Sequence, residues 1–192
     1  VCNENISRSP DQIVDMLSIL NYFWQICLLK RGAERIPPRT PIFSLILLIY
    51  VLTNTVGGLI ARPSQSVGLV LAMVIIEVLV FGLIPLLLLY YKNFPKRFVS
   101  TCTALLGAGA FIVCIQIPFI LLRQHSDIDL LIFFSESVWL VCLIWWLAIV
   151  GNLYHRSAQI SMLQGSAIAF VNMILIATLI LVVLPSPQTV SF

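Results

Sequence analysis

The chain alternates between long apolar stretches and short polar connections. Five of the stretches have about 20 residues or more, the length that a helix needs to cross a bilayer: residues 41–61, 66–90, 99–122, 129–151 and 165–184. The connections between them are too short to fold into a domain. The pattern predicts an all-α protein in which a five-span transmembrane bundle (residues 41–185) follows an N-terminal segment (1–40) and precedes a short tail (186–192).

A helix of another kind is predicted before the first span. Residues 9–12, Ser-Pro-Asp-Gln, have the form of a helix start, with a capping serine and then proline at the first helical position. Polar residues then recur every three or four positions and leave a wide apolar face that includes Leu17, Leu20 and Trp24. We expect an amphipathic helix in the cytoplasmic membrane interface, with burial against the bundle or a protein partner as the alternative.

The composition indicates that the lipid bilayer surrounds most of the chain. Hydrophobic residues make up 60% of the sequence and charged residues 10%, with a mean hydropathy of +1.04, whereas soluble domains are about one quarter charged. The five spans do not divide into matching halves, so the usual sign of an inverted-repeat transporter is missing. Any chemistry would therefore have to take place in or beside the bilayer.

The basic residues predict the orientation of the bundle. Nine of the 11 Lys and Arg residues lie on one side of a five-span topology, in the N-terminal segment and in the second and fourth connections. Because cytoplasmic loops carry an excess of Lys and Arg, we expect a bacterial inner-membrane protein with a cytoplasmic N-terminus and the tail outside. The net charge of +3 then reflects topology and contact with lipid headgroups, and we expect no nucleic-acid partner.

Motifs for catalysis or for binding cofactors are missing from the sequence. It contains no nucleophile elbow, zinc-protease helix, phosphate loop or dinucleotide fingerprint, and none of its five cysteines forms a Cys-x-x-Cys pair. His125 and His155 fall on opposite sides of the membrane in the predicted topology. The grouping of His125 with Asp127 and Asp129 is interpreted as a solvated loop. We expect no enzyme activity, no cofactor and no metal.

Four polar residues lie deep in the spans and are the main site candidates. At about 1.5 Å per residue, Glu77 is about 16 Å from the end of its span, and Asn54, Gln116 and Glu136 are about 9 to 10 Å from the same side. If the bundle turns them inward, two carboxyl groups meet two amides, and the low dielectric keeps at least one carboxyl protonated. We expect interhelical hydrogen bonds, with a proton-linked or ligand-binding pocket as the alternative.

The fourth span is rich in tryptophan. Trp139, Trp145 and Trp146 lie along it, the last two toward the predicted cytoplasmic end, where an aromatic belt is expected. Together with Leu17, Leu20 and Trp24 of the N-terminal segment, they are the candidates for contact with lipid or a partner.

Several of these features together resemble a known family. A segment ending in Cys27-Leu28-Leu29-Lys30-Arg31-Gly32 precedes five spans, the second and third contain proline, and the run WLVCLIWW (139–146) leads to Tyr154-His155-Arg156. This order is similar to that of small bacterial membrane proteins of the Yip1-like group. The resemblance implies a five-span bundle and, from the eukaryotic members, roles in membrane organisation and in binding partner proteins. It implies no catalytic residues.

These observations favour a non-catalytic membrane protein that acts as an accessory subunit of a larger complex or as a membrane-organising factor. We expect a protein partner or a homo-oligomer in the membrane. The alternative is a small-molecule or proton-linked transport component that uses Glu77 and Glu136. A third and weakest hypothesis is an intramembrane enzyme.

Overall fold

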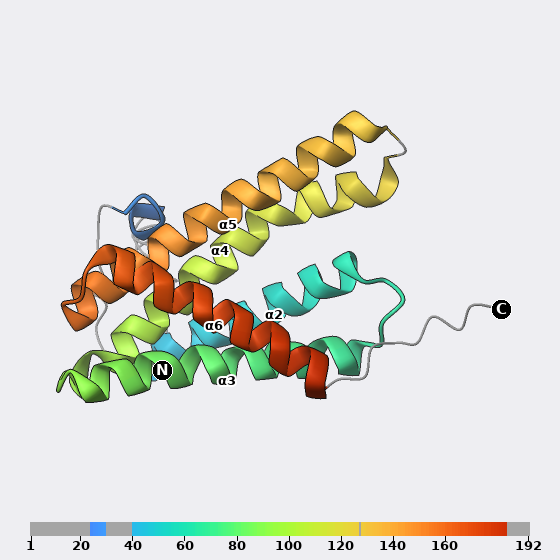
Figure 1. Cartoon of the computed structure of the whole chain (residues 1–192). Coiled ribbons are helices and arrows are strands. Elements are labelled where there is room, and N and C mark those ends of the chain that lie inside the picture. The colour runs from blue at the N-terminus through green and yellow to red at the C-terminus, as the bar shows by residue number, and fades with distance from the viewer. Residues whose placement is uncertain (1–23, 30–39, 127, 184–192) are drawn as a thin grey trace, which may run out of the picture.

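The computed structural model describes residues 24–29, 40–126 and 128–183. The regular elements in these ranges are all helical. Along the chain, the long helices are α2 (Thr40–Ala61), α3 (Val67–Tyr91), α4 (Phe98–His125), α5 (Asp129–Ala158) and α6 (Met162–Val183) (Figure 1). A short 3₁₀ helix, η2 (Pro95–Arg97), precedes α4. Five of these helices are long and apolar enough to cross a membrane. The prediction of an all-α, five-span fold is confirmed, and the chain is a multi-pass membrane protein.

The helix ends differ from the predicted spans where polar residues continue a helix. The fourth span was predicted to stop at residue 151, but α5 continues to Ala158 and ends where Gln159 adopts a left-handed conformation. The fifth span begins at Met162 and not at residue 165, because Ser161 and Gln164 form a reciprocal cap. Each side chain bonds the other residue's backbone N–H, at 3.2 and 3.1 Å.

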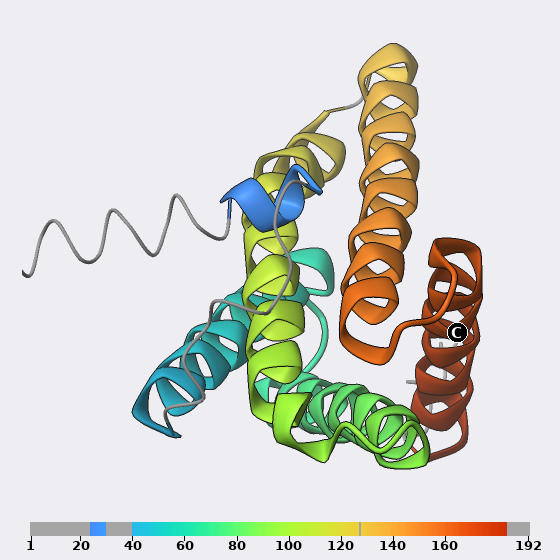
Figure 2. The same ribbon diagram turned by 90° about the vertical axis from the view of Figure 1, so that its left-hand side faces the viewer.

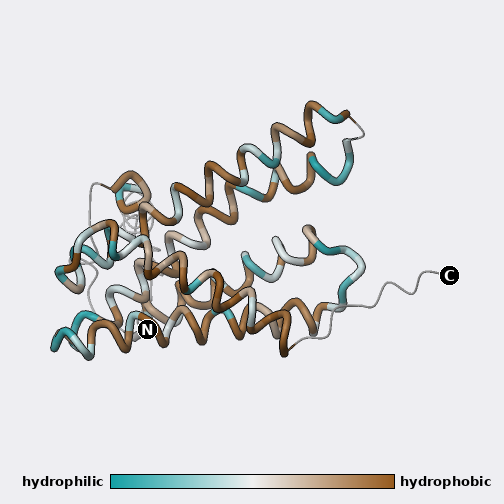
Figure 3. The backbone as a smooth tube through the Cα atoms, in the orientation of Figure 1, coloured by the Kyte–Doolittle hydropathy of each residue, from teal (hydrophilic) through white to brown (hydrophobic). Residues whose placement is uncertain are grey.

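The helices run up and down, so the connections alternate between two ends of the bundle. We call one the basic end, since it carries Lys92, Lys96, Arg97 and Arg156, and the other, where α2 meets α3 and α4 meets α5, the opposite end. Figure 3 shows hydrophilic residues gathered at these two ends, with predominantly hydrophobic helices between them. The alternation is the one that five consecutive spans require.

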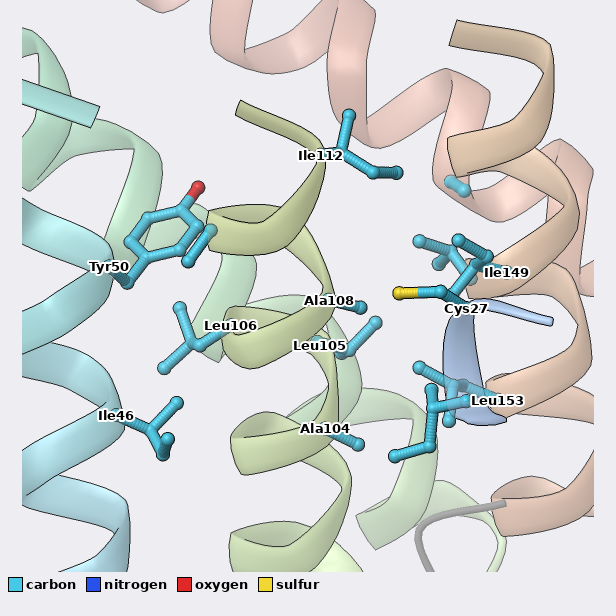
Figure 4. Close-up of a cluster of buried hydrophobic side chains, with 14 of the residues drawn as sticks. Cys27, Ile46, Tyr50, Ala104, Leu105, Leu106, Ala108, Ile112, Ile149 and Leu153 are labelled. Carbon is cyan, nitrogen blue, oxygen red and sulfur yellow. The ribbon is translucent and has the colours of Figure 1, made fainter. Parts of the chain in front are cut away.

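The core is centred on α4, which lies between α2 and α5 (Figure 2). Figure 4 shows Ile46 and Tyr50 of α2 on one side of α4, and Ile149 and Leu153 of α5 on the other. Small residues of α4, among them Ala104 and Ala108, are fully buried and let the neighbouring helices approach closely. This packing occupies what we call the basic half of the bundle, residues 98–112 of α4 and 142–158 of α5.

A close helix crossing joins α5 to α6 in the same half. A Cβ atom built on Gly165 would lie 2.7 Å from the carbonyl oxygen of Gly151 and 3.0 Å from its Cα. Ser166 also donates a hydrogen bond to the carbonyl of Leu147 at 3.1 Å. Glycine is needed at this crossing because no side chain fits between the two backbones.

The other half of the bundle is open. In Figure 1, α4 and α5 stay together but diverge from α3 and α6 toward the opposite end. We call residues 113–125 of α4 and 129–141 of α5 the opposite half. No residue of α4 in this range is buried, and Ser135 is the only buried residue in that range of α5. The contacts of α4 in this range are with α5 and with α2, since the side chain of Gln124 donates a hydrogen bond to the carbonyl of Ile60 and a Cβ on Gly57 would lie 3.0 Å from Val113.

Residues 24–29 are the described part of the predicted interfacial helix, and they lie between α4 and α5 (Figure 2). Ile26 and Cys27 are fully buried, the indole of Trp145 donates a hydrogen bond to the carbonyl of Cys27 at 2.8 Å, and Trp24 packs edge-on against Phe111 at 5.5 Å. This end of the segment therefore packs against the bundle. Leu17 and Leu20 lie outside the described residues.

Candidate functional site

The carboxyl group of Glu77 has a partner in the neighbouring helix. Glu77 lies on α3, and the phenolic OH of Tyr50, a buried residue of α2, donates a hydrogen bond to its Oε1 at 2.7 Å. The sequence analysis did not consider Tyr50. Its depth was a usable signal, because Tyr50 lies 11 residues before Ala61 and Glu77 lies 10 residues after Val67, which puts both about 15 to 16 Å from the opposite end.

Two of the other predicted polar residues lie beside this pair. The amide nitrogen of Asn54 donates to the backbone carbonyl of Tyr50, one turn earlier on α2, at 2.9 Å. Gln116 of α4 and the thiol of Cys142 on α5 line the same cavity. Asn54, Glu77 and Gln116 all line one cavity of about 130 Å³. Three of the four candidates, from three different helices, are therefore brought together.

We call this space the Glu77 cavity. Its remaining lining is apolar or aromatic, and the complete set consists of Tyr50, Asn54, Glu77, Phe81, Gly109, Ile112, Val113, Gln116, Trp139, Cys142, Leu143 and Trp146. None of these twelve residues is Lys, Arg or His. The cavity therefore has one acidic group, two amides, one thiol and four aromatic rings, without a basic residue in its wall.

Glu136, the fourth candidate, does not line the Glu77 cavity. Its Oε1 lies 3.4 Å from a guanidinium nitrogen of Arg123, and both side chains are more than half exposed, at 56% and 60%. Arg123 and Glu136 face each other because the α4–α5 hairpin places the end of one helix beside the start of the next. The expected meeting of two carboxyl groups is therefore replaced by a surface ion pair.

This ion pair lies on a second, larger hollow of about 470 Å³. We call it the α4–α5 groove, and its lining is Gln116, Phe119, Ile120 and Arg123 of α4 with Ser135, Glu136, Val138, Trp139 and Leu140 of α5. Gln116 and Trp139 line both hollows. The groove of the opposite half therefore adjoins the Glu77 cavity.

The aromatic wall of the cavity depends on a glycine. A Cβ atom on Gly109 would lie 2.8 Å from the Tyr50 ring and 3.4 Å from the Trp146 ring, so both rings rest on the bare backbone of α4. The Trp146 ring also lies 5.8 Å from that of Phe81, tilted by 58°. These contacts hold three of the four aromatic rings in place, while Trp139 is half exposed.

The tryptophans predicted to face lipid or a partner therefore separate into different roles. Trp145 binds the backbone of residues 24–29, Trp146 packs in the cavity wall, and Trp139 stands between the cavity and the groove. Trp139 and Trp24, at 53% and 44% exposure, are the two that keep a free face.

Cysteines and metal ligands add no chemistry to this site. Within the part of the chain that the structure describes, no three His, Cys, Asp or Glu side chains gather closely enough to hold a metal ion. Cys27, Cys102 and Cys142 are buried and Cys114 is exposed, all as free thiols. Burial raises the pKa of the Cys27 thiol from 9.0 to about 11, which disfavours the reactive thiolate.

The chemistry that the site offers is therefore the binding of a polar or cationic group in apolar surroundings.

The resemblance to the Yip1-like group rests on the order of spans and the quoted residues, and it stays a prediction. No protein-family model, curated protein or solved structure matches this chain.

Proposed function

We propose that this chain is a non-catalytic membrane protein that acts as an interaction subunit of a larger membrane complex or as a membrane-organising factor. The observation that carries the proposal is the open opposite half. Its two helices, α4 and α5, have Ser135 as their single fully buried residue there and present the α4–α5 groove of about 470 Å³. A transmembrane helix of a partner, with small residues facing the groove, would gain the van der Waals contacts that drive association in lipid.

The pairing of Glu77 supports a structural role for the deepest carboxyl group. Tyr50 already satisfies one of its oxygens, and the pair links α2 to α3 near the middle of both helices. A hydrogen bond of this kind contributes about 0.6 to 1.7 kcal/mol to helix association in membranes. Glu77 therefore has a sufficient reason to be there without any transport step.

For the location, we propose that the basic end faces the cytoplasm of a bacterial inner membrane. The support is the Lys and Arg excess at that end and in the N-terminal segment. Single cysteines placed at Lys96 and Arg156 should be shielded from a membrane-impermeant reagent in intact cells, whereas one at Ser64 should react. The opposite result would invert the orientation.

The interaction role is tested by site-specific photocrosslinking. A photoreactive residue at Leu140, which is 52% exposed and lines the groove, should crosslink one protein in stoichiometric amounts after mild detergent extraction. The matched control is Leu181 on α6, which is 74% exposed and lies outside the groove, and should give lipid adducts only. A chain that is extracted alone and crosslinks only lipid from both positions would contradict the proposal.

A second candidate function is a small-molecule or proton-linked transport component, and the observation that favours it is that the two hollows are neighbours. Through Gln116 and Trp139, the groove adjoins a cavity that reaches Glu77. In this case Glu77→Gln should abolish transport while the protein remains folded, because only the titratable proton or the charge is lost. Transport that survives this substitution would exclude the candidate.

A further inference from the structure

The charged groups in the wall of the Glu77 cavity favour a ligand with a charge of one sign. Glu77 is its single ionisable acid, and none of its lining residues is Lys, Arg or His. A bound cation would stabilise the ionised form of this carboxyl group, whereas a bound anion would make its ionisation more costly. The electrostatics of the cavity therefore favour a positively charged ligand.

The four aromatic rings indicate which kind of cation fits. Tyr50, Phe81, Trp139 and Trp146 line the same cavity as the carboxyl group, and aromatic faces attract alkylated ammonium groups through their quadrupole. A hard metal ion instead requires about six or more oxygen ligands. The cavity supplies few oxygens, because one carboxylate oxygen accepts from Tyr50 and the remaining side-chain acceptors are the amides of Asn54 and Gln116.

The size of the cavity agrees with a compact ligand. Its volume of about 130 Å³ is slightly below that of an engineered apolar cavity of about 150 Å³ that holds one benzene molecule. An ammonium carrying three or four methyl groups is of this size. The α4–α5 groove adjoins this cavity on the side of the opposite end, where the two share Gln116 and Trp139 in their lining.

We propose that the Glu77 cavity binds a compact alkylated ammonium ion, with Glu77 as its counter-ion and the rings of Trp139 and Trp146 against its methyl groups. If the protein is a transport component, the proposal names its class of substrate. The binding site itself does not depend on transport, because an interaction protein can bind such an ion as well. Binding is therefore measured apart from flux. A protein that binds the ion but does not transport it would refute the transport candidate and support the site.

The test is equilibrium dialysis of labelled tetramethylammonium against the purified protein in lipid nanodiscs. We expect saturable binding at one site, no competition by tert-butanol, which is uncharged and of similar size, and little competition by sodium at the same concentration. Glu77→Gln keeps an acceptor for Tyr50 but removes the charge, so affinity should fall by about thirtyfold or more. Glu136→Gln, the matched control, removes the other intramembrane acid from a different site and should leave affinity unchanged.

Trp139→Leu provides a second variant in case Glu77→Gln does not fold, since Trp139 is half exposed and contributes little to the core. Losing its ring should weaken binding by roughly threefold to tenfold. The proposal is overturned if wild-type protein shows no saturable binding, or if sodium or tert-butanol displaces the ion. Unchanged affinity in the folded variants of Glu77 and Trp139 would overturn it as well.

Discussion

The two halves of the bundle are built from different side chains and pack differently. In the basic half, glycine, alanine and threonine bring helices together, as in the contact of Gly151 with Gly165 and the buried run around Ala104. In the opposite half, α4 and α5 carry large apolar and charged residues, and Ser135 is the single one that is fully buried. Close packing at one end lets the helices separate at the other, which leaves room for the groove and the cavity.

Polar contacts follow the same division. At the basic end, the guanidinium of Arg97 donates to the carbonyl of Ser157 at 3.4 Å, and Thr101 donates to the hydroxyl of Ser157 at 3.0 Å, so α4 is tied to the end of α5. At the opposite end, the contact of Arg123 with Glu136 is exposed to its surroundings. We therefore expect substitutions to cost less the farther they lie from the basic end.

The largest effect is expected at the crossing of α5 and α6. Gly165→Ala would force a methyl group against the backbone of Gly151, and overpacking of this kind costs about 1 to 3 kcal/mol. The measurement is equilibrium unfolding in mixed micelles, followed by circular dichroism. Gly82→Ala on α3 is the control, because a Cβ there would meet nothing within 4 Å and alanine favours the helix by up to about 1 kcal/mol. Equal effects of the two substitutions would refute close packing at this crossing.

The next effect concerns the thiol of Cys27, in the segment that packs on the basic half. Its pKa is raised from 9.0 to about 11, and only the thiolate reacts with a maleimide, so alkylation at pH 8 should be about a hundredfold slower than in the unfolded chain. The raised pKa means that the difference shrinks as the pH rises toward 11. The experiment uses a variant with Cys27 as its single cysteine, in mild detergent and in SDS. Similar rates in both would mean that residues 24–29 do not pack against the bundle.

A smaller effect is expected for the hydrogen bond between Tyr50 and Glu77, where the two halves meet. Tyr50→Phe should cost about 1 kcal/mol of unfolding free energy. Glu77→Leu should cost a similar amount, and the double variant should cost little more than either one, because both remove the same bond. Fully additive losses would show that the two side chains do not depend on each other.

The smallest effect is expected at the opposite end. Arg123→Gln should change the unfolding free energy by less than about 0.5 kcal/mol, because Arg123 lies two residues before the end of α4, where its long side chain reaches the aqueous interface and the ion pair is more than half exposed. The remaining difference should disappear in high salt, where exposed charges are screened. A loss above about 1.5 kcal/mol would contradict the view that this half is loosely packed.

The span count could be predicted from the sequence because the bilayer sets the length of each apolar stretch. The start of α6 could have been predicted as well, since Ser161 and Gln164 have the spacing of a capping box. Depth along the spans put Asn54, Glu77 and Gln116 in the same half of the bundle, and the three residues line one cavity. It could not show which way Glu136 turns, because a helix that is apolar on every side gives no periodic signal for its inward face.

The docked position of residues 24–29 has a consequence for the order of assembly during synthesis. The carbonyl of Cys27 accepts its hydrogen bond from a residue 118 positions later in the chain. At about 5 to 20 residues per second, ribosomes need roughly 6 to 24 s to make that stretch. During this interval Ile26 and Cys27 have no α5 to pack against, so they are open to a chaperone or the insertion machinery. Docking of this segment is therefore a late step that reports whether α4 and α5 have been inserted side by side.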